Sequence, residues 1–200
     1  MSLVIVGGHS RNVGKTSVVA GLIAALRERD WTAVKITQYG HGVCSVNGES
    51  CGCAVDEHTF AITEERDRSG KSDTSRFLAA GARRSLWVRT KQGRLAEAMP
   101  DLRREMAGAG NVILESNSVI RFLRPDLYLT VLDPGTADFK QSAREFLDLA
   151  SAVLLHASAA EPAWSEVSLK PAAGKPCFYI HPPDYVTDEL VGFVRQSLRG

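Results

Sequence analysis

The sequence predicts an α/β protein of three layers, in which helices cover both faces of a mostly parallel sheet. Short apolar runs alternate with amphipathic stretches along most of the chain. Runs such as 111–115 and 127–132 are apolar almost throughout, as expected for strands buried on both faces. The first run passes into a glycine-rich loop that ends in Gly14-Lys15-Thr16. Because parallel strands need crossover connections, this alternation predicts an α/β/α fold.

The first predicted strand covers 3–6 and the second covers 32–37. Between them, residues 16–29 have the spacing of an amphipathic helix. Its apolar side chains recur on one face, and they are Val18, Val19, Leu22, Ile23 and Leu26. Residues 38–58 are rich in Gly and Cys and have no periodicity, which predicts a Cys-rich excursion after the second strand.

The middle of the chain is less regular. Residues 59–72 are mixed in composition, and we expect them to be irregular or hairpin-like. Asp73 is suited to cap a helix that runs to Ala80, which Gly81 would end. A third strand is predicted at 84–89. An amphipathic helix is predicted at 95–107, although Pro100 could kink or split it.

The remaining elements continue the alternation of strands and helices. Residues 157–175 contain several prolines and one short helical stretch. Strands are predicted at 111–115, 127–132, 152–155 and 177–180, and helices at 139–149 and 185–198. Glu115 closes its strand at the carboxyl edge, where parallel sheets bind ligands.

Composition is that of a soluble globular protein of one domain. The chain has 200 residues, of which 44% are hydrophobic and 24% charged. A net charge of +1 argues against a nucleic-acid partner held by bulk charge. No apolar stretch is long enough to span a bilayer, and no basic segment of a signal peptide is evident. We therefore expect a cytoplasmic protein without a membrane partner, whose four cysteines do not form a disulfide framework.

The glycine-rich loop predicts a phosphate site, because backbone N–H groups at a helix N-terminus bind phosphate oxygens. In such a loop Lys15 would reach the β- and γ-phosphates and the Thr16 hydroxyl would bind Mg²⁺. Five residues separate Gly8 from Gly14, one more than usual, so the first glycine of the usual pattern falls on His9. The predicted nucleotide-binding residues are Gly8, Arg11, Asn12, Val13, Gly14, Lys15, Thr16 and Ser17, together with Asp73.

Magnesium bound by Thr16 also needs a carboxylate ligand. Glu115 is the first candidate, and its alternative is a solvated acid at a strand end. Asp73 is the second candidate, and its alternative is a plain helix cap. Lys35, near the end of the second strand, would face phosphates or a substrate carboxylate, or else solvent. Lys15, Glu115 and Lys35 are therefore the candidate catalytic residues, and Arg76 would bind an anion or pair with Asp73.

Three cysteines lie close together in the excursion. Cys44, Cys51 and Cys53, with His58, would suit zinc or an iron–sulfur centre, because thiolate and imidazole bind both. The alternatives are a lid with incidental thiols and a redox-sensitive pair. Cys177 falls in a strand and is expected to be an inert core residue.

The tryptophans have a structural interpretation. Trp31, Trp87 and Trp164 are too dispersed along the chain to form a base-stacking platform. We expect them in the core or at a partner surface.

Several short motifs resemble the MobB family, the molybdopterin-guanine dinucleotide biosynthesis protein B. They are His58-Thr-Phe60, Gly70-Lys71-Ser-Asp73-Thr-Ser-Arg76, Ala79-Ala80-Gly81-Ala82, Ile113-Leu114-Glu115 and Lys175-Pro176-Cys177-Phe178. The loop itself is more similar to that of dethiobiotin synthetase. The resemblance implies one P-loop domain over 1–200 that binds GTP or ATP with Mg²⁺, hydrolyses it slowly and assists guanylation of the molybdenum cofactor. It also implies a homodimer and a partner protein in cofactor biosynthesis or among molybdoenzymes.

The chain departs from that family in two places. Ser116-Asn117 stands where the family has a glycine, which lets backbone approach the γ-phosphate, so vigorous hydrolysis is not expected. Residues 42–54, within the Cys-rich insertion 41–58, have no counterpart in the family.

Two other functions stay open at this point. One is an ATP-dependent ligase or kinase of the dethiobiotin synthetase type, which the loop spacing and Lys35 favour. The other is a nucleotide-gated metal-handling or regulatory module. The base is also open, because the guanine-selecting Asn-Lys-x-Asp motif is absent and Ser168-Leu-Lys170-Pro171 is the candidate base-binding loop.

Overall fold

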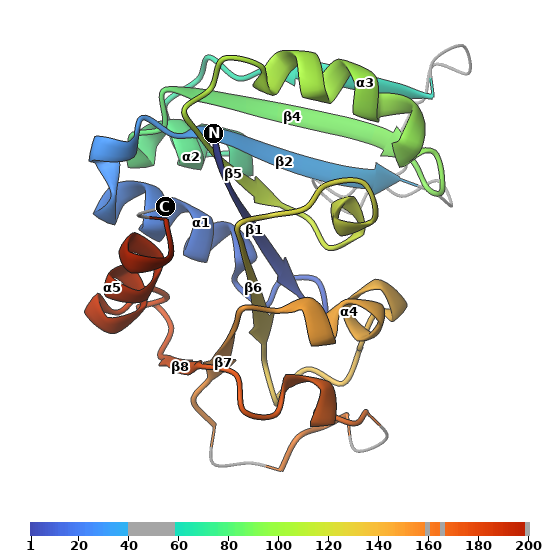
Figure 1. The fold of residues 1–200 in the computed structure, drawn as a ribbon, viewed down its shortest axis with the longest axis vertical. Coiled ribbons are helices and arrows are strands. Elements are labelled where there is room, and N and C mark those ends of the chain that lie inside the picture. The colour runs from blue at the N-terminus through green and yellow to red at the C-terminus, as the bar shows by residue number, and fades with distance from the viewer. Residues whose placement is uncertain (40–58, 159–160, 165–166, 199–200) are drawn as a thin grey trace.

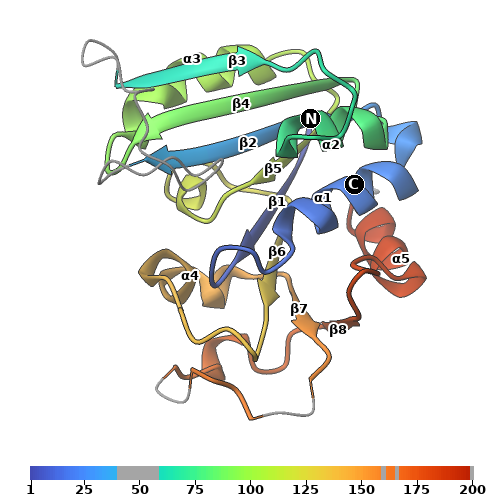
Figure 2. The same ribbon diagram turned by 180° about the vertical axis from the view of Figure 1, so that it is seen from behind.

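The structure is a computed structural model that describes residues 1–39, 59–158, 161–164 and 167–198. It confirms the predicted fold class, because one eight-stranded sheet lies between two layers of helices (Figures 1 and 2). The predicted Cys-rich excursion falls outside the described residues. In the described part of the chain, no helix is both long and apolar enough to cross a membrane.

The strands are parallel except at one edge. Across the sheet their order is β3-β4-β2-β5-β1-β6-β7-β8, and only β3 pairs antiparallel, with β4. In chain order the strands are β1 (Ser2–Gly8), β2 (Thr32–Tyr39), β3 (Phe60–Glu64), β4 (Arg84–Lys91), β5 (Asn111–Glu115), β6 (Leu127–Leu132), β7 (Ala152–His156) and β8 (Cys177–Ile180). The strand order changes direction around β1, so the loop that follows β1 lies at a switch point where such sheets bind ligands.

Helices divide between the two faces of the sheet. They are α1 (Lys15–Ala25), α2 (Asp73–Ala80), α3 (Leu95–Met106), α4 (Gln141–Glu145) and α5 (Asp188–Ser197), with short 3₁₀ turns at Arg27–Arg29, Ser118–Arg121, Leu147–Leu149 and Lys170–Ala172. One face is covered by α1, α2 and α5, which lie in front of the sheet in Figure 2. The other face is covered by α3 and α4.

Alternate residues of each inner strand enter the two cores. In β1, Val4 and Val6 pack with α1, whereas Leu3 and Ile5 pack with the α3 layer. Successive side chains of a strand point to opposite faces, so a strand covered on both sides must be apolar throughout. This requirement explains the continuous apolar runs of the sequence.

Two helices begin later than predicted. Residues 139–149 were expected to form one helix, but α4 begins at Gln141 and a 3₁₀ turn covers Leu147–Leu149. The backbone of Lys140 is extended, and its N–H donates to the His9 carbonyl at 2.8 Å, so the chain cannot coil before that point. Helix α5 begins at Asp188 rather than 185, because the Thr187 side chain caps it.

Both edges of the sheet also differ from expectation. Residues 60–64, predicted as irregular or hairpin-like, form the edge strand β3. Cys177 was expected in the core, and that prediction is wrong, because β8 is the opposite edge strand and leaves its thiol exposed.

The N-terminus of α2 is fixed by a capping box. Ser72, not Asp73, is the cap: its hydroxyl accepts from the Ser75 N–H, and its own N–H donates to Ser75 Oγ. The Glu65 carboxylate accepts from the hydroxyls of Ser72 and Thr74 at 3.1 and 2.8 Å. Asp73 is thereby the first helical residue, and its carboxylate is available for contacts outside the helix.

We predict that Ser72→Ala lowers the free energy of unfolding by about 1 kcal/mol, because it removes the cap of α2. Chemical denaturation monitored by circular dichroism measures this change. Ser197→Ala is the matched control, since the exposed Ser197 hydroxyl only donates back to Phe193 of its own helix. The control should stay within about 0.5 kcal/mol of wild type. Equal losses in both variants would show that the capping box does not stabilise α2.

Candidate functional site

The loop after β1 has the geometry of an anion site. Asn12 and Gly14 have φ angles of 58° and 88°, in the left-handed region that turns successive N–H groups toward one point. Gly14 is also the N-cap residue of α1. Because glycine has no side chain that could accept from the first N–H groups of α1, these groups remain open to a ligand. A Cβ atom at Gly14 would lie 2.0 Å from the Tyr185 ring, so this position requires glycine.

Val13 differs from its neighbours in the loop. Its side chain is buried in the core beneath α1, and its carbonyl accepts from His156 Nε2 at 3.0 Å. Arg11 and Asn12 are exposed at the tip. Val13 can thus contribute only its backbone N–H to a bound phosphate, whereas Arg11 and Asn12 can also contribute side chains.

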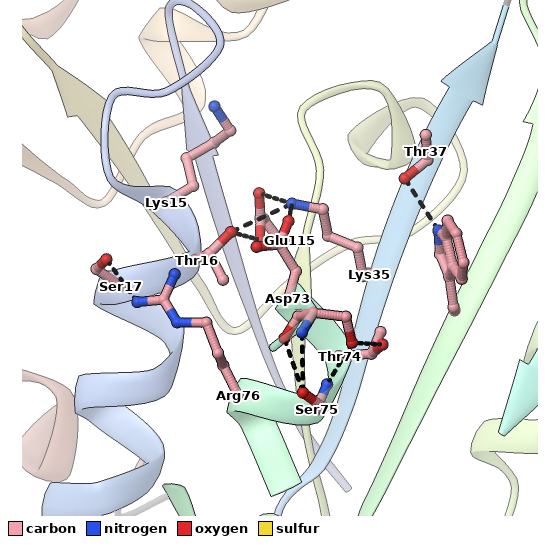
Figure 3. A network of polar contacts seen from close by, with 12 residues as sticks. Lys15, Thr16, Ser17, Lys35, Thr37, Asp73, Thr74, Ser75, Arg76 and Glu115 are labelled. Carbon is pink, nitrogen blue, oxygen red and sulfur yellow. Dashed lines mark hydrogen bonds and ion pairs between the residues drawn. The ribbon is translucent and has the colours of Figure 1, made fainter. Parts of the chain in front are cut away.

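Lys15 is the half-buried cation of the loop. Its ammonium donates to the Ser10 carbonyl and extends away from the Glu115 carboxylate (Figure 3). Burial lowers the pKa of Lys15 to about 8, and the attraction of Glu115 only partly opposes this shift. Among the described residues no carboxylate forms an ion pair with Lys15, and a partly desolvated ammonium in this state favours binding of negative charge.

Thr16, Lys35, Asp73 and Glu115 meet in one cluster (Figure 3). Thr16 Oγ1 donates to Glu115 Oε2 at 2.8 Å. The Lys35 ammonium lies 2.5 Å from Glu115 Oε1, 2.7 Å from Asp73 Oδ2 and 3.2 Å from Thr16 Oγ1. Sheet register causes this meeting, because Glu115 pairs with Val6 on one side and with Lys35 on the other.

The cluster is deeply buried on the β5 side and open toward Asp73. The Glu115 side chain is 4% exposed and that of Asp73 is 46% exposed. Burial alone would lower the pKa of Lys35, but the Glu115 and Asp73 carboxylates outweigh it and raise that pKa. Lys35 is therefore charged, and it neutralises a carboxylate that would otherwise be buried alone.

The donor set of this cluster fits magnesium. Hydroxyl and carboxylate oxygens are the hard ligands that Mg²⁺ prefers, and Thr16 and Glu115 provide them beside the loop. The Lys35 ammonium binds the same oxygens, so metal and ammonium compete for them. Elsewhere in the described part of the chain, no group of three or more His, Cys, Asp or Glu side chains forms a metal site. The predicted ligands Cys44, Cys51, Cys53 and His58 lie outside the described residues.

Helix α2 also contacts α1, the helix that follows the loop. The Arg76 guanidinium donates to Ser17 Oγ at 3.0 Å, while Asp73 pairs with Lys35. The expected pairing of Arg76 with Asp73 is therefore replaced by contacts from each residue to a different element. Of the two α2 residues that were singled out in the motif Gly70–Arg76, Asp73 thus contacts the Lys35 cluster and Arg76 contacts Ser17 at the end of the loop.

His9, which stands where the usual pattern has glycine, is a buried structural residue. Its Nδ1 donates to the Asp138 carbonyl at 2.8 Å, and its Nε2 accepts from the Asp133 N–H at 3.0 Å. The ring packs at a tilt against the rings of Phe139 and Trp164. Because one ring nitrogen donates and the other accepts, the imidazole is neutral. Burial lowers the pKa of His9, and this outweighs the opposing effects of Asp138 and Asp133.

Asn117 is a site residue that sequence reasoning missed. Its side-chain amide binds the Gly8 backbone twice, since Oδ1 accepts from the Gly8 N–H and Nδ2 donates to the Gly8 carbonyl, each at 2.8 Å. Gly7 is the neighbour that permits this approach, because a Cβ there would lie 2.1 Å from Asn117 Oδ1. The sequence showed that Ser116-Asn117 stands where the resemblance leads one to expect a glycine. It did not show that the Asn117 side chain would bind the backbone of the loop at Gly8.

Lys140 is a second residue that the sequence did not single out. It follows Asp138, whose carboxylate accepts from Ser10 Oγ at 2.6 Å, and its N–H donates to the His9 carbonyl. Burial and the nearby Arg11 lower the pKa of Lys140. The Asp138 carboxylate only partly opposes this shift. The segment 138–140 therefore runs along the loop and adds a cation to its surroundings.

No family model matches this chain, and no curated protein matches it. Among solved structures it is similar to LpxK from Aquifex aeolicus, solved in complex with ATP, at 20% identity and a TM-score of 0.49. That match covers 90% of this chain and 53% of the LpxK chain, so this chain spans about half the length of LpxK.

Two further structures are similar over almost the whole chain. HypB from Helicobacter pylori, solved in complex with nickel, matches at 14% identity and a TM-score of 0.48, covering 98% of this chain and 84% of HypB. Bacillus subtilis MobB matches at 15% identity and a TM-score of 0.43, covering 100% of this chain and 99% of MobB. Likeness at this level concerns the fold alone, and no activity follows from it.

We predict that the free energy of unfolding decreases as the pH falls from about 6.5 to about 5.5. Unfolding releases His9, whose pKa then rises to its ordinary value near 6.5, so the unfolded chain takes up the proton that the folded chain resists. The loss reaches at most about 1.4 kcal/mol per pH unit for one proton. Denaturant titrations across this range measure it.

His9→Gln keeps a donor and an acceptor but cannot take up a proton, so it should remove this slope. His181→Gln changes an exposed histidine after the edge strand β8 and serves as the control. A slope that survives in His9→Gln would contradict the assignment to His9.

Proposed function

We propose that this protein binds a nucleoside triphosphate, GTP or ATP, with Mg²⁺ at the loop Gly8–Ser17, and hydrolyses it slowly. The observation that carries this proposal is the contact between Thr16 Oγ1 and Glu115 Oε2 at the N-terminus of α1. A hydroxyl and a carboxylate side by side, next to open helical N–H groups, provide for both the metal and the phosphates that it accompanies.

Each residue of the site has a distinct role in this proposal. Lys15 leaves the Ser10 carbonyl for the β- and γ-phosphates, and the N–H groups of the loop bind phosphate oxygens. Thr16 and Glu115 would hold Mg²⁺, which would neutralise charge on the phosphates. Lys35 contacts Asp73 as well as Glu115, so its ammonium would be available to the γ-phosphate while it stays paired with Asp73.

Slow hydrolysis follows from the residues after Glu115. Asn117 uses its amide to hold Gly8, and the Ser116 N–H donates to the Val6 carbonyl at 3.2 Å. Neither group is available to the γ-phosphate or to an attacking water. The site therefore favours holding the nucleotide over cleaving it.

For the biological role we propose a MobB-like function, in which the nucleotide serves guanylation of the molybdenum cofactor. The support is that Asp73 and Arg76, from the motif that carries the resemblance, both reach the loop region. The proposal includes one nucleotide-binding domain over 1–200, a cytoplasmic homodimer, and a partner protein that uses or makes the cofactor.

A kinase or ligase of the dethiobiotin synthetase type is the second candidate. Lys35 lies between the Asp73 and Glu115 carboxylates, beside the place proposed for the γ-phosphate. An ammonium there would stabilise charge during transfer to an acceptor molecule. Turnover of ATP that rises sharply with one added acceptor would favour this candidate.

The third function, a nucleotide-gated metal-handling module, depends on Cys44, Cys51, Cys53 and His58. Zinc or an iron–sulfur cluster at these residues stays a prediction. Elemental analysis of purified protein tests it, and a content of neither zinc nor iron would remove it.

We predict that Lys15→Ala weakens binding of Mg-GTP and Mg-ATP by roughly 100-fold, because it removes the ammonium that pairs with the β- and γ-phosphates. Calorimetric titration with both nucleotides measures the affinity and identifies the base. Lys175→Ala is the control. Lys175 precedes β8 at the amino end of the sheet, away from the loop, and its ammonium donates to the Asp148 carbonyl. Lack of nucleotide binding by the wild type, or equal binding by Lys15→Ala, would refute the proposal.

We also predict that nucleotide affinity falls as the pH rises above about 8. The pKa of Lys15 is about 8 in the free protein, and a bound triphosphate raises it. Binding above that pH therefore takes up a proton, which costs up to roughly tenfold in affinity per pH unit. Titrations in buffers of different ionisation enthalpy count this proton.

Lys15→Arg keeps its charge throughout this range, so its affinity should be independent of pH. A wild-type affinity that is constant between about pH 7.5 and about pH 9.5 would contradict the assignment to Lys15.

A further inference from the structure

A second group of polar residues lies beside the cluster, on the same face of the sheet. One row of paired residues crosses four strands: Thr63 pairs with Trp87, Trp87 with Lys35, and Lys35 with Glu115. Neighbouring strands lie about 4.8 Å apart, so Trp87 is one strand from Lys35 and two strands from Glu115. The next row on this face pairs Thr37 with Arg89.

These side chains point to the α2 side of the sheet. In β4, Leu86 and Val88 pack with the α3 layer, so Trp87 and Arg89 point the opposite way. Helix α2 begins at Asp73, whose carboxylate contacts Lys35 in the first of these rows. Thr37 and Arg89 therefore lie beyond Lys35, toward the carboxyl ends of their strands, and Figure 3 shows Thr37 farther along β2 than Lys35.

Trp87 and Arg89 form one unit. The Arg89 guanidinium lies 4.6 Å from the centre of the Trp87 ring, and Trp87 Nε1 donates to Thr37 Oγ1 at 3.1 Å. Both side chains are half-buried. Stacking on the ring and this hydrogen bond hold the guanidinium and the indole in fixed positions relative to β2.

Among the residues that the structure describes, no carboxylate neutralises the charge of Arg89. Its Nε is buried and has no hydrogen-bond partner among the described residues, and no carboxylate of that part of the chain pairs with its guanidinium. A buried donor without an acceptor is costly, and the cost is greater when the donor is charged. Solvent does not reach Nε, so an anion would bind to the two terminal nitrogens of the guanidinium in a planar, two-pronged manner, and its charge would offset that of the side chain.

We propose that Trp87 and Arg89 bind the anionic group, a carboxylate or a phosphate, of a small second ligand beside the nucleotide. The proposal deepens the proposed function and rests on it for the identity of the neighbouring ligand. The ligand would extend from Arg89 across Trp87 toward Lys35 and Asp73. A molecule that accepts a group from the nucleotide has to lie next to the phosphates. Lys35 borders both the proposed phosphate site and the Trp87–Arg89 site, so a ligand there would meet this requirement.

Tryptophan fluorescence tests the proposal on the full chain. Trp31 and Trp164 are buried, whereas Trp87 is half-buried and contacts the proposed anion-binding residue. Citrate and glycerol phosphate serve as the carboxylate and phosphate probes, each titrated with and without saturating Mg-ADP. We expect a saturable change with at least one probe when Mg-ADP is present, and loss of that change in Trp87→Phe.

Arg89→Met keeps the length of the side chain and removes its charge, so probe affinity should fall roughly tenfold or more. Arg89→Lys keeps the charge but not the two-pronged geometry, and it should bind the probe with intermediate affinity. Arg83→Gln is the control, because Arg83 is an exposed arginine just before β4, at the amino end of the sheet. Thermal unfolding of every variant checks that the fold is intact.

The outcomes separate this proposal from the proposed function. Arg89→Met should bind Mg-nucleotide as the wild type does. If the protein bound no nucleotide but still responded to a probe through Arg89, the nucleotide site would be refuted and the anion site at Arg89 would stand. The proposal is overturned by absence of a saturable response to either probe, by an equal response in Arg89→Met, or by a response that Lys15→Ala removes and Arg89→Met does not.

Discussion

The contacts of Lys35 with Glu115, Thr16 and Asp73 are the interactions on which this site depends. Glu115 ends an inner strand and is almost fully buried, so its charge requires a partner within the protein. Lys35 is that partner, and through it β2, β5, α1 and α2 meet at one point. Loss of one member of a buried ion pair costs about 3–5 kcal/mol, so the arrangement of these elements and the charge of the site are fixed together.

The same contacts set the order in which charges can enter the site. Lys35 already holds the oxygens of Thr16 and Glu115 that suit Mg²⁺. A divalent ion arriving alone would meet this ammonium and the nearby Lys15, whereas an ion accompanied by phosphates brings the negative charge that both cations lack. If the proposed function holds, we therefore expect metal and nucleotide to bind most favourably together, because the phosphates would offer Lys35 a new partner in place of the metal ligands.

Sequence reasoning was most accurate where the signal was local. The strands 111–115, 127–132 and 177–180 were predicted to the residue, because apolar runs mark them, and the helix 73–80 was predicted with its cap misplaced by one residue. Thr16, Lys35, Asp73 and Glu115 could be brought together because parallel strands end at a common edge. The late start of α4, the exposure of Cys177 and the contacts of His9, Asn117 and Arg89 depend on which distant segments become neighbours. A single sequence does not contain that information, and Cys44, Cys51, Cys53 and His58 remain predictions.

The amide of Asn117 has a mechanical consequence. By donating to and accepting from Gly8, it makes the same pair of hydrogen bonds that a neighbouring strand would make, and it joins the loop after β1 to the segment after Glu115. In proteins that signal through nucleotide exchange, a segment that senses the γ-phosphate moves while the loop stays still. Here the two hydrogen bonds of Asn117 tie the two segments together, so we expect them to shift as a unit. Any motion in response to the nucleotide of the proposed function would then involve elements outside this pair.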